Sequence, residues 1–148
     1  MIVPRPVFRP VAEAVTLSVP RRRAVTFRVA WPRAFVFADA PDLAQAAKAA
    51  AQAIFRNAGQ VCVAGSRLLV ERTVADDFLA ALTKATEAMA VGNPLSLATQ
   101  VGAVNSEAQL AANLRFVQDA EAEGGQVLTG GGRILAETGG TYMAPTVV

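Results

Sequence analysis

The residue best suited to covalent chemistry is Cys62, the only cysteine of the chain, which lies in the stretch FRNAGQVCVAGSR between Phe55 and Arg67. A cysteine thiolate can attack a carbonyl carbon when the sulfur is accessible and a nearby donor stabilises the oxyanion that forms. Gly59 permits a tight turn, and the small residues after the cysteine would leave its sulfur within reach of a substrate. The backbone N–H of Cys62 is one candidate donor for the oxyanion.

The same cysteine has a plainer interpretation, because a free cysteine in an apolar setting usually packs as a small hydrophobic side chain. The 148 residues include no histidine, which excludes a Cys–His pair and a His/Cys metal site. A single cysteine also excludes an intramolecular disulfide. From the local chemistry alone, a nucleophile and a buried structural residue both stay open.

The elements predicted on either side of Cys62 form a strand–helix–strand unit. The apolar run Phe35-Val36-Phe37 indicates a buried strand, and a helix is predicted from about Asp42 to Arg56. Asn57-Ala58-Gly59 should end this helix, because glycine readily takes the left-handed conformation. A second strand is predicted from Arg67 to Glu71.

Further along the chain, the pattern continues to alternate between helices and extended pieces. Two capping pairs, Thr73/Asp76 and Ser106/Gln109, should each open a helix. Extended pieces are predicted at 126–129 and 142–148, with a triple-glycine turn at 130–132 between them. Strands that alternate with helices are typical of an α/β fold, in which a layered, mostly parallel sheet is flanked by helices.

Charge and proline content divide the chain near residue 34. Residues 1–33 hold seven arginines against one acid, Glu13, together with five of the eight prolines and none of the glycines. We therefore expect 1–34 to be a separate Arg/Pro-rich, disordered segment, and 35–148 to be the globular part. The run Arg21-Arg22-Arg23 lacks a fold motif and interleaved aromatic side chains, so we expect a solvated tail and no nucleic-acid partner.

The hydropathy pattern argues against a membrane protein. No apolar run approaches the roughly 18 residues that span a bilayer, and arginines and prolines interrupt the first 20 residues, where a secretory signal would need an apolar stretch. We therefore expect no membrane partner and a cytoplasmic location. The other conspicuous side chains should serve packing or solvation and not catalysis; they are Trp31, Tyr142, Asp76, Asp77, Glu121 and Glu123.

Residues 35–148 resemble the aldehyde dehydrogenase superfamily. The pattern FxNxGQxCxAGSR around Cys62 is similar to the nucleophile motif of that family, and further similar stretches are FADAPDL, SRLLVER, VGNPL and GGTYMAPTVV. The combination of the PDL helix start with GQVCVAGSRLLVE most resembles γ-glutamyl-γ-aminobutyraldehyde and related ω-aminoaldehyde dehydrogenases. The resemblance therefore identifies 35–148 as part of a catalytic domain.

The resemblance implies that Cys62 is a catalytic nucleophile. In the family, the cysteine attacks a small-molecule aldehyde, and the resulting thiohemiacetal passes a hydride to NAD or NADP. A glutamate then activates the water that hydrolyses the thioester. The resemblance also implies a homo-oligomer and assigns no metal.

The chain departs from the family pattern at the base and at the cofactor region. The E-x-G-G-K stretch of the family is expected just before Phe35, where this chain has no acid between Glu13 and Asp39. The triple glycine lacks the strand–loop–helix context of a dinucleotide fingerprint, so no cofactor-binding residue is assigned. The sequence also looks cut at both ends. We therefore expect a fragment that is inactive alone or, alternatively, a non-catalytic remnant that associates through exposed sheet edges.

Overall fold

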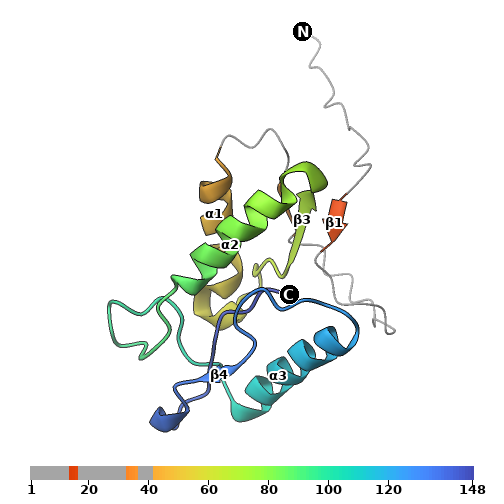
Figure 1. Ribbon diagram of the computed structural model, residues 1–148. Coiled ribbons are helices and arrows are strands. Elements are labelled where there is room, and N and C mark those ends of the chain that lie inside the picture. The colour runs from red at the N-terminus through yellow and green to blue at the C-terminus, as the bar shows by residue number, and fades with distance from the viewer. Residues whose placement is uncertain (1–13, 17–32, 37–41) are drawn as a thin grey trace.

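A strand–helix–strand unit forms the first part of the structure. The computed structural model describes residues 14–16, 33–36 and 42–148 (Figure 1). Strand β2 (Arg33–Val36) runs parallel to strand β3 (Arg67–Glu71), and helix α1 (Leu43–Phe55) connects them. The bounds of α1 and β3 confirm the sequence prediction closely. The strand predicted at 35–37 begins two residues earlier, and Phe37 lies outside the described residues.

A short third strand completes this sheet. Strand β1 (Ala14–Thr16) pairs antiparallel with β3, so that the order across the sheet is β1-β3-β2. These three residues belong to the segment 1–34 for which we expected disorder, as do Arg33 and Ala34 of β2. The rest of that segment up to residue 32 lies outside the described residues, so its separate character stays a prediction.

Helix α2 (Ala75–Glu87) packs against α1 beside the sheet (Figure 1). Alanines at 47, 50 and 51 of α1 are buried, and these small side chains allow the two helices to approach closely. Phe78 and Leu82 of α2 fill the space between α1 and β3 and are fully buried, which contributes about 2 kcal/mol each. The hydrophobic core therefore lies directly behind the strand that follows Cys62.

The predicted capping pair before α2 is wrong. Val74 occupies the N-cap position and makes no side-chain cap, because a short 3₁₀ turn (Arg72–Val74) precedes the helix. The hydroxyl of Thr73 instead donates to the Glu71 carboxylate at 3.2 Å. Asp76 and Asp77 in the first turn still favour the helix, since their negative charges face the positive end of its dipole.

Helix α3 (Glu107–Ala122) confirms the second capping prediction, because the Ser106 hydroxyl accepts a hydrogen bond from the Gln109 N–H at 3.2 Å. Leu110, Val117 and Ala120 form its buried face. The helix ends before Gly124, whose φ of 92° lies in the left-handed region that glycine tolerates.

The C-terminal part forms less regular sheet than the sequence predicts. Residues 126–129 form no strand and contribute only one bridge, between Thr129 and Val147. Gly130 and Gly131 take positive φ values there, which interrupts an extended backbone. Strands β4 (Arg133–Ile134) and β5 (Tyr142–Met143) form a short hairpin, and Pro145 follows with no N–H to offer.

An ion pair fastens this hairpin to α3. The guanidinium of Arg133 donates to both carboxylate oxygens of Glu107, at 2.7 and 3.3 Å, and also to the carbonyl of Gly140 at 3.0 Å. The described strands and the helices that pack beside them agree with the predicted α/β class. Among the described residues, no helix is long and apolar enough to cross a membrane.

Thr86→Val should raise the free energy of unfolding by about 1 kcal/mol. The Thr86 hydroxyl is buried and finds no hydrogen-bond partner within the part of the chain that the structure describes, so an isosteric methyl group removes a desolvation penalty. Urea denaturation followed by circular dichroism measures the change. Thr83→Val, at a half-buried position of the same helix, is the matched control and should change little. A Thr86→Val chain no more stable than the original would contradict this account.

Candidate active site around Cys62

The chain leaves α1 through three consecutive left-handed residues. Asn57, Ala58 and Gly59 have φ values of 53°, 54° and 75°, within the short turn Arg56–Gly59. Glycine adopts this conformation freely and asparagine tolerates it, but an alanine there costs about 1 kcal/mol. Such strain persists only where the surroundings hold the backbone in place, and it is frequent at functional sites.

Asn57 holds this turn closed. Its side-chain Nδ2 donates to the carbonyl of Gln60 at 3.1 Å, while the Gln60 N–H donates to the carbonyl of Asn57 at 3.0 Å. Gln60 contributes its backbone, and Asn57 supplies the side chain. An asparagine directly before Ala-Gly was the available signal, because asparagine is enriched in left-handed turns.

Cys62 lies in a second turn, which leads into β3. The N–H of Ala64 donates to the carbonyl of Val61 at 3.1 Å, and this bond places Cys62 and Val63 at the corner of the turn. The Cys62 thiol is free and exposed, and Val63 beside it is 69% exposed. In the described part of the chain, neither the thiol nor the N–H of Cys62 takes part in a hydrogen bond. A carbonyl compound could therefore meet the sulfur and the backbone donor together.

The acidic side chains named in the sequence analysis lie on helix surfaces. Asp76 and Asp77 are exposed in the first turn of α2, and Glu121 and Glu123 are exposed at the end of α3. Tyr142 is half-buried in β5. Trp31 lies outside the described residues, and so does the stretch before β2 where the family places its glutamate. Within the described ranges, no three His, Cys, Asp or Glu side chains form a group that could hold a metal ion.

The described residues do not fit the phosphates of a dinucleotide. Helix N-termini are the usual anion sites, but α1 begins at the Asp42 carboxylate, which accepts from the Gln45 N–H at 2.9 Å. The first turns of α2 and α3 carry acids as well. Gly130 lies so close to the backbone of Pro145 that even a Cβ atom would overlap its carbonyl oxygen. Gly130 therefore makes room for the neighbouring segment at Pro145 and Thr146 and leaves none for a phosphate.

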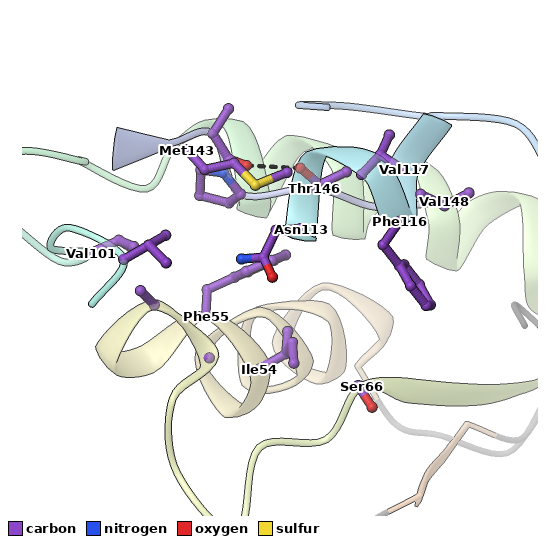
Figure 2. A pocket seen from close by; sticks show the side chains of 15 residues that line it. Ile54, Phe55, Ser66, Val101, Asn113, Phe116, Val117, Met143, Thr146 and Val148 are labelled. Carbon is purple, nitrogen blue, oxygen red and sulfur yellow. Dashed lines mark hydrogen bonds between the residues drawn. The ribbon is translucent and has the colours of Figure 1, made fainter. Parts of the chain in front are cut away.

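A cavity of about 350 Å³ lies next to the turn that precedes Cys62 (Figure 2). Ala58 and Gly59 contribute to its wall, together with the end of α1, the side of α3 and the segment 143–148. Cys62 does not line it. The cavity and the thiol are therefore separate features that share one loop.

Comparison with known proteins shows the family. The model of the aldehyde dehydrogenase family matches residues 32–148. The chain is 44% identical over 113 residues to betaine aldehyde dehydrogenase of Sinorhizobium fredii, a match that covers 76% of this chain and 23% of the relative. The chain thus spans about a quarter of the length of such relatives.

Solved structures agree with the sequence comparison. An indole-3-acetaldehyde dehydrogenase solved with NAD+ matches with a TM-score of 0.74 and 48% identity, over 77% of this chain and 23% of that one. The γ-glutamyl-γ-aminobutyraldehyde dehydrogenase of Burkholderia cenocepacia matches with a TM-score of 0.73 and 45% identity, over the same shares. The predicted resemblance is confirmed: this chain belongs to the aldehyde dehydrogenase family.

Proposed function

We propose that Cys62 is the nucleophile of this chain and that it adds reversibly to the carbonyl group of small aldehydes. The thiolate sulfur forms a bond to the carbonyl carbon, the π electrons move to the oxygen, and that oxygen takes up a proton to give a thiohemiacetal. No oxidant is needed for this step. The Cys62 N–H donates to the oxygen as its charge develops.

The observation that carries the proposal is the exposed thiol on a clamped turn. Asn57 and Gln60 fix the backbone on one side of Cys62, and the Val61–Ala64 turn fixes it on the other. The sulfur is exposed, which argues against the alternative in which Cys62 packs as a small buried hydrophobe. Membership of a family that oxidises aldehydes through a cysteine supports the same role.

We propose further that this chain by itself stops at the covalent adduct. Oxidation to a carboxylic acid would require NAD or NADP and a general base, and in the described residues neither an anion cradle nor a carboxylate bonded to Cys62 supports those steps. Cys62 derives from an enzyme that carries out the whole oxidation of an aldehyde to a carboxylic acid. We expect that enzyme to be cytoplasmic and, as in the family, a homo-oligomer.

The experiment is to mix the purified chain with carbon-13-labelled propanal and follow the carbonyl carbon by NMR. A thiohemiacetal signal should appear and saturate at one equivalent, and with NAD+ present no NADH absorbance should develop. Cys62→Ser should give no such signal. NADH formation by the chain alone would show that it completes the oxidation, and a signal that survives in Cys62→Ser would remove Cys62 from the proposal.

A second candidate is a non-catalytic remnant that associates through its sheet edge. Within the described strands, β2 is an edge strand that pairs only with β3. Leu95 and Leu97, on the loop after α2, are 90% and 106% exposed and could add apolar contact. An unprotected edge is a template for pairing with another chain. Light-scattering assemblies that grow with concentration, without any aldehyde adduct, would favour this candidate over the first.

A further inference from the structure

The cavity beside the Cys62 loop is lined almost entirely by apolar side chains (Figure 2). Ile54 and Phe55 at the end of α1 face Phe116 and Val117 of α3 across it, and Met143 lies near its upper wall. No charged side chain contributes to the lining. A volume of about 350 Å³ is at the lower end of the range for small-molecule sites, about 300–1,000 Å³. The lining therefore favours a small uncharged ligand.

Two of the three polar side chains in the wall are poorly placed to select a ligand. The hydroxyl of Thr146 donates to the carbonyl of Ala144 at 2.8 Å (Figure 2) and accepts from the N–H of Gly131 at 2.9 Å, so it has no proton left to donate to a ligand carbonyl. Ser66 is exposed at the start of β3. The specificity of the cavity therefore depends on the third polar residue, Asn113.

Asn113 presents one fixed donor to the cavity. Its Oδ1 accepts from Gln109 Nε2, one turn earlier in α3, at 2.8 Å. This bond sets the orientation of the amide and leaves Nδ2, which makes no hydrogen bond within the described residues, at the cavity wall. Figure 2 shows the side chain reaching from α3 toward Phe55 of α1. A donor held in place in apolar surroundings selects a ligand with one hydrogen-bond acceptor.

We propose that this cavity is a binding site for a small, uncharged, largely apolar molecule that carries one carbonyl oxygen, which accepts from Asn113 Nδ2. The site is distinct from Cys62, and no covalent step occurs in it. Because Ala58 and Gly59 belong both to its wall and to the left-handed turn before Cys62, a bound molecule would also brace that turn.

The experiment uses a matched pair of probes, acetophenone and ethylbenzene, which differ in the carbonyl oxygen. Each is titrated into the nitrogen-15-labelled chain, and amide NMR shifts are followed. Both probes should give saturable shifts at lining residues such as Asn113, Phe116 and Ala144, and acetophenone should bind more tightly. Asn113→Leu should weaken acetophenone about fivefold, the size expected for one neutral hydrogen bond, and leave ethylbenzene unchanged.

Two controls make the test specific. Gln118→Leu removes an exposed amide of the same helix that does not line the cavity, and it should leave both affinities unchanged. Unchanged ethylbenzene binding shows that Asn113→Leu keeps the cavity folded. The proposal is wrong if neither probe shifts the lining signals, or if acetophenone loses nothing in Asn113→Leu. It is also wrong if those signals move with protein concentration alone, since a second copy of the chain then covers the cavity. None of these readouts depends on the reactivity of Cys62.

Discussion

Cys62→Ser is expected to abolish the release of p-nitrophenolate from p-nitrophenyl acetate, which the unchanged chain should perform in a single burst of one equivalent. The thiolate attacks the ester carbonyl, the phenolate leaves with the bonding electrons, and the acetyl group stays on sulfur as a thioester. A second turnover requires water activated by a base, and no carboxylate is bonded to Cys62 in the described structure. The burst should therefore end, and a serine hydroxyl is too weak a nucleophile to replace the thiol.

Absorbance of the released phenolate measures the burst, and intact mass spectrometry locates the acetyl group. The matched control moves the thiol to another element: Cys62→Ser combined with Gln118→Cys places one exposed thiol on the outer face of α3. That thiol should react about tenfold more slowly, because the backbone N–H groups inside a helix are already bonded to its own carbonyls and none is left for the oxyanion. Equal rates at the two positions would mean that the Cys62 turn contributes nothing to reactivity.

Gly130→Ala is expected to be the most destabilising single-methyl change in the C-terminal part of the chain. Gly130 has a φ of 80°, and a Cβ added there would overlap the Pro145 carbonyl oxygen and lie 2.8 Å from Thr146 Oγ1. Pro145 and Thr146 would have to move, which breaks the hydrogen bond from Gly131 N–H to Thr146 and disturbs the Thr129–Val147 bridge. Strain and lost contacts together should cost about 3 kcal/mol.

Gly124→Ala provides the comparison for this change. Gly124 has a φ of 92°, yet nothing lies within 4 Å of the Cβ that would be added. Only the left-handed strain remains, about 1 kcal/mol. By thermal unfolding, we expect the melting temperature to fall by about 10 °C for Gly130→Ala and about 3 °C for Gly124→Ala. Equal losses at the two positions would show that the close approach to Pro145 does not matter.

Local signals in the sequence predicted the first half of the fold well. The apolar face of α1, the glycine-containing turn after it and the apolar run Leu68-Leu69-Val70 all act over a few residues, and α1 and β3 appear where those signals place them. Ser106 capped α3 as predicted, because its hydroxyl needs only the N–H of Gln109. The prediction that Thr73 caps α2 is wrong because Thr73 lies in a 3₁₀ turn before the helix. Its hydroxyl donates to the Glu71 carboxylate and does not reach the N–H groups of α2.

The C-terminal elements depend on contacts that the sequence does not reveal. The run 126–129 has strand-forming side chains, but it pairs with another segment at only one bridge, between Thr129 and Val147. Gly130 and Gly131, which have positive φ values, end the extended backbone on one side of this bridge, and Pro145 lies just before Val147 on the other. The partner of Arg133 is Glu107, 26 residues earlier. The role of Cys62 stays a prediction, and only its surroundings can be compared with the sequence. The motif located Cys62, whereas the clamp by Asn57 and the cavity beside it arise from backbone conformation and from the approach of α3.

The central claim is that the folded turn presents Cys62 as a nucleophile for aldehydes, and the affinity of the thiohemiacetal tests it most directly. Carbon-13 NMR with labelled propanal gives this affinity for the chain and for the isolated peptide FRNAGQVCVAGSR, which contains the same thiol without the fold. We predict that the chain binds propanal about tenfold more tightly, because its N–H donor and backbone are already in place. Asn57→Ala should lower the affinity toward that of the peptide. Equal affinities for chain and peptide would contradict the account.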